Sequence, residues 1–184
     1  MRILFIALIG ITASFLFLQG RLNERNGEKP VFLRHDEIAD AHRTKINVNI
    51  HSIYKPDSVQ LETLINDYSN IWAHLNHLYE TNDVEAGKEY YTEDWFKQIN
   101  RHFNFNGTVK SAIKRSDVQH ELQIENWAWD GLVCTVTDSN LVFHYTYPDK
   151  SIKTQKANLE MVLLYQGDHW RIDALRVKNE SFQN

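Results

Sequence analysis

The sequence predicts an α+β domain in which helices precede an antiparallel sheet. Apolar residues recur at three-and-four spacing over residues 57–79, as in an amphipathic helix. Residues 118–178 instead indicate four strands separated by turn signals. The 184 residues are 42% hydrophobic and 12% aromatic, which is enough for one buried core. We therefore expect a single folded domain.

The first twenty residues predict a segment that directs the chain to a membrane. Arg2 precedes an uncharged run from Ile3 to Leu18, and no A-x-A cleavage site stands before Arg21. A run of this length is slightly short for a comfortable membrane span. We expect residues 1–20 to be either a transmembrane anchor that crosses through residues 3–18 or a cleaved signal peptide. The protein is then membrane-anchored with a single pass, or exported to the cell envelope.

The orientation of such an anchor stays open. Basic residues follow the apolar run and outnumber Arg2, which favours a cytoplasmic domain. Glu24 and Glu28 lie among these basic residues and reduce their net charge. Together with the usual export role of such segments, these two acidic residues favour a domain outside the cytoplasm.

Residues 21–56 read as a polar spacer. Asn26-Gly27 and Pro30 interrupt it, with room for a short helix. Near its end, Ile46, Val48 and Ile50 alternate with polar residues, which predicts a loose edge strand that ends before Pro56.

Three helices are predicted after the spacer. Asp57 is a good N-cap for a long amphipathic helix that buries one face. A short helix is expected over VEAGKEYY, and Thr92 caps a third helix over EDWFKQINRHF. The apolar stripe of the long helix consists of Leu61, Leu64, Ile65, Tyr68, Ile71, Trp72, Leu75, Leu78 and Tyr79.

The four strands are predicted to form three consecutive hairpins. Turns are expected at Asp130-Gly131, at residues 148–150 and at Gly167-Asp168. In the second hairpin, an even-length loop would place Phe143 and Tyr145 on the mixed face, whereas an odd-length loop or a bulge would place them on the face that carries Leu159 and Met161; we favour the odd-length loop. A two-residue loop in the last hairpin would set the pairs Tyr165–Trp170, Leu163–Ile172 and Met161–Ala174 on one face. The other face would carry Val162, Leu164, Glu160, Arg171, Asp173 and Leu175.

This order of elements resembles the nuclear transport factor 2-like superfamily, also called SnoaL-like. The resemblance covers residues 57–178, from the long helix through NDVEAGKEYY to a meander that ends in MVLLYQGDHWRIDAL, and leaves residues 179–184 as a tail. It implies a cone-shaped fold in which three helices pack on a curved antiparallel sheet around a pocket. Members of the superfamily include isomerases, dehydratases, polyketide cyclases, transport adaptors and membrane-anchored secretion factors, so the resemblance implies no single function.

Composition excludes several classes of function. A net charge of −4 and the absence of a basic block argue against nucleic acid as a partner. Cys134 is the only cysteine, so the chain can form neither an internal disulfide nor a thiolate zinc cluster, and we expect a buried thiol. His74 and His77 lie off the apolar stripe, which predicts solvated histidines rather than metal ligands. We expect no metal site and no cofactor.

Two sets of candidate site residues follow from the predicted faces. His144, Glu160 and Asp173 share one sheet face and could perform acid/base catalysis, although Arg171 on the same face favours a solvated charge cluster. The aromatic candidates for a ligand pocket are Tyr90, Tyr91, Trp95, Trp127 and Trp129. Of these, we expect Trp127 and Trp129 to belong to the core, whereas the two tyrosines are better pocket candidates.

Two functions stay open at this stage. The favoured hypothesis is a non-catalytic binding or assembly module, held at a membrane or exported, that binds a small hydrophobic ligand or a protein partner. A homodimer through the sheet face is also expected. The alternative is a small acid/base enzyme of the isomerase, dehydratase or cyclase type that acts in the pocket. The two hypotheses differ in whether an ionisable side chain points into the cavity against apolar walls.

Overall fold

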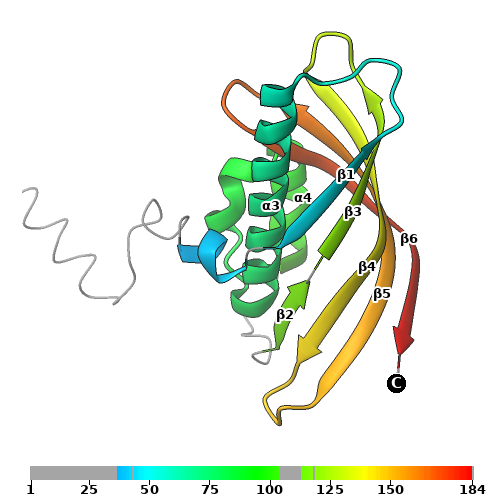
Figure 1. The fold of residues 1–184 in the computed structure, drawn as a ribbon. Coiled ribbons are helices and arrows are strands. Elements are labelled where there is room, and N and C mark those ends of the chain that lie inside the picture. Colours follow the sequence, from blue (N-terminus) through cyan, green and yellow to red (C-terminus); the bar gives the residue numbers. More distant parts are fainter. Residues whose placement is uncertain (1–36, 43, 104–112, 118, 184) are drawn as a thin grey trace, which may run out of the picture. The chain divides into compact units, whose positions relative to one another are not determined.

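In the computed structural model, six strands form one curved sheet, and the helices cover one of its faces (Figure 1). The structure describes residues 37–42, 44–103, 113–117 and 119–183. The predicted anchor or signal peptide therefore lies outside the described residues. Among the residues that are described, no helix is long and apolar enough to cross a membrane.

The predicted long helix is α3, Ser58–Thr81. Asp57 is its N-cap: the Asp57 carboxylate accepts a hydrogen bond from the Gln60 backbone N–H at 2.8 Å, and the Gln60 side chain accepts one from the Asp57 N–H at 3.0 Å. Asn82 ends the helix in the left-handed conformation, with φ of 62°. The buried face follows the predicted stripe and includes Leu64, Tyr68, Ile71, Trp72, Leu75 and Leu78.

Two shorter helical segments follow α3. The segment predicted over VEAGKEYY is a 3₁₀ helix, η1, Glu85–Tyr90. The predicted third helix is α4, Glu93–Phe103. Thr92 caps α4, because its Oγ1 accepts from the Trp95 N–H at 3.3 Å, and the same hydroxyl donates to Asp173 at 2.9 Å. The start of α4 is thereby tied to the last strand of the sheet.

The predicted meander is present as β3 (Gln119–Trp127), β4 (Val133–Thr146), β5 (Ile152–Tyr165) and β6 (Trp170–Gln183). One residue in each hairpin loop adopts a positive φ, namely Gly131, Lys150 and Gly167. The last strand continues past residue 178, where we expected it to end.

The sheet is mixed rather than wholly antiparallel. The predicted edge strand is β1 (Lys45–Ile50), and it pairs with β3 in the parallel direction at one end of the sheet. Parallel pairing requires a long crossover, and the helical segments between β1 and β3 supply it. A strand that the sequence did not predict, β2 (Lys114–Asp117), pairs with residues 143–146 of β4, beyond the part of β4 that pairs with β3.

The register of the last hairpin differs from the prediction at one point. Tyr165 pairs with Trp170 and Leu163 with Ile172, as expected, but Met161 pairs with Leu175 rather than with Ala174. A bulge at Asp173 causes this shift, because it adds one residue to β6. Leu175 therefore turns to the inner face with Met161, which corrects the expected placement on the outer face.

The second hairpin follows the predicted odd-length loop. Tyr147 pairs with Ser151 across a three-residue turn, since the Tyr147 N–H donates to the Ser151 carbonyl at 2.9 Å. Phe143 lies opposite Gln155, on the face that also buries Ala157 and Leu159. Phe143 and Tyr145 are therefore on the helix-covered face of the sheet, as the sequence predicted.

Candidate functional site

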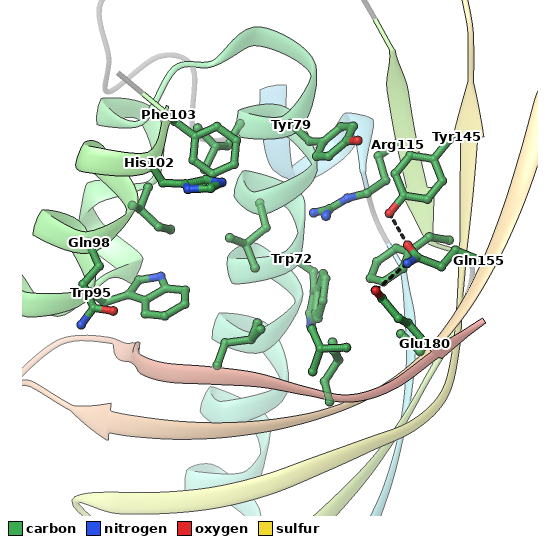
Figure 2. A pocket seen from close by; sticks show the side chains of 18 of the residues that line it. Trp72, Tyr79, Trp95, Gln98, His102, Phe103, Arg115, Tyr145, Gln155 and Glu180 are labelled. Atoms are coloured by element: carbon green, nitrogen blue, oxygen red, sulfur yellow. Dashed lines mark hydrogen bonds between the residues drawn. The ribbon is translucent and has the colours of Figure 1, made fainter. Parts of the chain in front are cut away.

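A cavity of about 710 Å³ lies between α3, α4 and the inner face of the sheet (Figure 2). Its volume falls within the usual range for sites that bind small molecules. Aromatic side chains supply much of the lining, and they come from both helices, from β4 and from the turn after it. The rings are Trp72, Tyr79, Trp95, Phe103, Phe143, Tyr145 and Tyr147.

The helical periodicity of the sequence brings these residues to one space. On α4, Trp95, Ile99 and His102 follow one another at intervals of four and three residues, so they share one face of the helix. Ile99 is the single buried residue of α4. Because the inward face of α4 meets the cavity rather than packed side chains, the helix forms a wall of the site.

One wall of the cavity carries a stripe of polar side chains. The Tyr145 hydroxyl donates to Gln155 Oε1 at 2.6 Å, and Gln155 Nε2 donates to Glu180 at 2.8 Å (Figure 2). Arg115 on β2 lies directly opposite Tyr145 in the sheet register. The stripe therefore extends from a guanidinium on β2 to a carboxylate on β6, and the other walls are mostly apolar.

The Arg115 guanidinium is enclosed by aromatic rings. Its central carbon lies 4.9 Å from the Phe143 ring centroid, 5.0 Å from that of Tyr79 and 5.9 Å from that of Trp72. Its Nε donates to Asn76 Oδ1 at 2.7 Å. Burial lowers the pKa of Arg115, and Tyr145 and Asp117 partly offset this effect. Arginine stays protonated in proteins, so the cavity contains a fixed positive charge.

A second polar cluster is buried behind Trp72. His120 is fully buried between two carboxylates, with Nε2 2.6 Å from Asp117 Oδ2 and Nδ1 in contact with Asp138 Oδ2. The Tyr68 hydroxyl donates to the same Asp138 oxygen at 2.7 Å. Burial alone would lower the pKa of His120, but the hydrogen bonds to the two carboxylates outweigh it and raise the pKa to about 9. His120 is therefore an imidazolium at neutral pH.

Asn76 joins this cluster to the cavity. Its amide nitrogen donates to Asp117, while its oxygen accepts from Arg115. The Trp72 ring, 5.0 Å from the His120 ring centroid, lines the cavity, whereas His120 and its two carboxylates are absent from the described lining. The cluster is thus placed to hold Asn76 and Arg115 in position, and its imidazolium does not reach the cavity.

The three predicted acid/base residues lie away from the cavity lining. His144 and Glu160 alternate with inward-facing residues of β4 and β5, so they point to the outer face of the sheet. Glu160 forms an ion pair with Lys178 at 2.5 Å, and Asp173 accepts the hydrogen bond from Thr92. Arg171, which we expected near Asp173, instead binds Asp168, Gln166 and the Glu89 carbonyl.

Trp95 is the one member of the predicted aromatic set that lines the large cavity in the described structure. Tyr90, Tyr91 and Trp127 are buried in the core. Trp129 is 80% exposed, contrary to the core role expected for it, because it lies in the turn after β3. It lines a separate groove with Ile53 and Tyr54.

His74 corrects another expectation, because it is 2% exposed rather than solvated. The Tyr90 ring of η1 stacks on it with ring centroids 5.2 Å apart. The sequence pattern of α3 alone could not show that η1 covers this side of the helix. Cys134 is buried, as predicted, and burial raises the pKa of its thiol to about 12.

One group of three side chains with metal-ligating atoms occurs among the described residues: Glu89, Asp168 and His169. His169 contacts Asp67 at 3.1 Å and Glu89 at 2.9 Å, and Asp168 pairs with Arg171 at 2.9 Å. These contacts account for the cluster as a link between α3, η1 and the last hairpin.

The residues that the sequence analysis missed are Arg115, Asn76 and the His120 cluster. A signal for His120 was present, because it has the same inward parity on β3 as Leu122 and Ile124. Asp138 likewise shares parity with Val136 and Cys134 on β4. A histidine and an aspartate at core parity on adjacent strands indicate a buried ion pair.

No family model matches the chain, and no curated protein matches it. Among solved structures, it is similar to a proposed aromatic ring hydroxylase from Novosphingobium aromaticivorans, with a TM-score of 0.50, 11% identity, and 71% of this chain and 96% of that one covered. A proposed scytalone dehydratase from the same organism gives a TM-score of 0.49 and 8% identity over 68% and 91% of the two chains. A proposed ketosteroid isomerase from Shewanella frigidimarina gives 0.38 and 12% over 61% and 94%.

Identities this low show the fold alone. The described domain, with helices on one face of a curved sheet, has the nuclear transport factor 2-like fold that the order of sequence elements predicted.

Proposed function

We propose that this domain is a non-catalytic binding module that holds a small, largely apolar, ring-containing molecule in the cavity between α3, α4 and the sheet. The lining of the cavity carries this proposal: aromatic walls and a single polar stripe enclose about 710 Å³. Apolar walls with a few oriented polar groups are typical of small-molecule sites.

Fewer observations support the alternative function, an acid/base enzyme that acts in the cavity. His120 is the most strongly perturbed histidine of the described chain, but Trp72 separates it from the cavity. Among the described lining residues, His102 supplies an imidazole and Glu180 a carboxylate, and these two groups are the acid/base candidates for an enzyme that acts in this cavity. Loss of turnover in Glu180→Gln, for any compound that the protein converts, would favour this second function.

We also propose that the module acts at a membrane or in the cell envelope, as a single-pass anchored or exported protein. The support is the uncharged run from Ile3 to Leu18. A protein partner, or a second copy of the chain on the outer sheet face, is a further proposal from the sequence.

The binding proposal is tested by filling the cavity. Isothermal titration calorimetry of the full chain with 2-naphthylmethanol should give saturable one-to-one binding. Ala157 is buried and lines the cavity, so Ala157→Phe should weaken binding by about 10-fold or more. Ala174 is exposed and lies outside the lining, which makes Ala174→Phe the matched control.

Thermal unfolding of both variants shows whether they fold. Equal affinity in the wild type and a folded Ala157→Phe, or no saturable binding by the wild type, would contradict the proposal.

A further inference from the structure

Resting on the binding function above, we propose that the ligand is an aromatic acid whose carboxylate binds Arg115. The inference concerns the chemical class of the ligand, and three features of the site carry it: the geometry of the guanidinium, its charge surroundings and the shape of the apolar walls.

The guanidinium is held in a fixed orientation with donors directed at the cavity. The Nε of Arg115 donates its hydrogen bond to Asn76, and three aromatic rings surround the guanidinium group. Figure 2 shows the terminal nitrogens directed into the space between Tyr79 and Trp72. A guanidinium with its terminal amino groups presented in this way matches the two oxygens of a carboxylate.

The positive charge of Arg115 lacks a direct anionic partner in the described part of the chain, where no carboxylate forms an ion pair with it. The charge of Asp117 raises the pKa of Arg115, but the Asp117 carboxylate is hydrogen-bonded to His120 and Asn76 rather than to the guanidinium. The hydrogen bonds of the Asn76 amide link Arg115 to the buried cluster, whose two carboxylates are both bonded to the His120 imidazolium. A ligand carboxylate would supply the contact that a desolvated guanidinium favours most.

The rest of the cavity favours a flat apolar body beside this anchor. Trp95 and Phe103 of α4 and Leu159 and Leu175 of the sheet line the cavity. Indole and phenyl rings provide broad apolar surfaces that stack on another ring system. A carboxylate joined to an aromatic ring therefore satisfies both the charged end and the apolar walls.

Two probes with the same ring test this inference: 2-naphthoate and the neutral 2-naphthylmethanol, titrated calorimetrically into the full chain at pH 7.5. A charge-assisted bidentate contact should make the wild type prefer 2-naphthoate by about 10-fold to 100-fold. Arg115→Met should reduce this preference to less than about 3-fold while 2-naphthylmethanol still binds. Arg176→Met, which removes an exposed cation outside the cavity, should keep the full preference.

Arg115→Lys provides a second variant if Arg115→Met does not fold. Lysine keeps the positive charge but lacks the planar pair of donors that can bind both carboxylate oxygens. The preference for 2-naphthoate over 2-naphthylmethanol should therefore fall several-fold without vanishing. A wild type that binds both probes equally, or an Arg115→Met that keeps the preference, would overturn the inference. Loss of the preference in His102→Gln but not in the Arg115 variants would assign the anion to His102 instead.

These outcomes separate the two proposals. Binding of 2-naphthylmethanol that is sensitive to Ala157→Phe, without preference for 2-naphthoate, leaves the binding module intact and rejects the aromatic acid. Failure of both probes to bind rejects the binding module and the acid together.

Discussion

The two halves of α3 face the same sheet but meet different surroundings. In the first half, Asp67 accepts a hydrogen bond from the Trp170 backbone N–H at 2.9 Å, and Leu64 and Tyr68 are fully buried. In the second half, Leu75 and Tyr79 line the cavity together with α4. The comparison shows how one helix can close a core at one end and leave a ligand-sized space at the other.

The difference arises from what covers the sheet. Trp127 and Trp170 fill the closed end, with ring centroids 5.0 Å apart. At the open end, α4 places side chains that meet the cavity rather than the sheet. Trp72 lies at the boundary, since it contacts His120 on one side and lines the cavity on the other. We therefore expect stability to reside mainly in the closed half and binding in the open half.

The largest effect should come from truncating the boundary residue. Trp72 is 2% exposed, so Trp72→Ala should lower the free energy of unfolding by about 3 to 5 kcal/mol, as large core truncations do. Trp95 is half-buried at the cavity, and Trp95→Ala should cost only about 1 kcal/mol. Urea denaturation of both variants measures the contrast. Similar losses would contradict the expected contrast between the buried boundary residue Trp72 and the cavity-wall residue Trp95.

The next effect concerns the buried imidazolium. The pKa of His120 is raised to about 9, above its ordinary value of 6.5. The stabilisation from its protonation is therefore fully present below about pH 6.5 and is lost as the pH rises through about 9, with a total of about 3 kcal/mol. Urea denaturation at pH 6, 8 and 10 measures this loss. The same series on His120→Gln should show a much flatter pH dependence, and an unchanged slope would exclude His120 as its source.

The smallest effect is expected on the outer face. The Lys178–Glu160 ion pair is partly exposed, so Glu160→Gln should change stability by less than about 0.5 kcal/mol. Glu160 lies outside the described cavity lining, and the affinity for 2-naphthoate should stay unchanged. A large loss of binding in this variant would mean that the outer face takes part in the function.

Local signals explain the parts of the fold that the sequence predicted. The Asp57–Gln60 capping box and the three-and-four spacing define α3 without help from distant residues. The turn residues likewise define the three hairpins. The pairing of β1 and the bulge at Asp173 escaped prediction, because each depends on contacts between segments far apart in the chain.

Fewer residues of the candidate site than elements of the fold could be predicted from the sequence. Trp95 was identified as one of five aromatic residues whose rings could form the apolar walls of a pocket. Arg115 was missed, since KRSD resembles an ordinary solvated segment until Phe143, Tyr79 and Trp72 are placed around it. Alternation along β3 could have identified His120 as buried, but the partner that holds its charge, Asp138, lies on the next strand.

The parallel pairing of β1 with β3 bears on the order in which the domain assembles. Each hairpin from β3 to β6 closes a short loop, whereas β1 must wait for all the helical segments and for β3 before it finds its partner. During synthesis from the N-terminus, Ile46, Val48 and Ile50 therefore emerge early and stay unpaired until the chain has grown past residue 124. An alternating apolar strand in that state is a site for pairing with other chains, so the nascent protein needs protection at β1 more than at any hairpin.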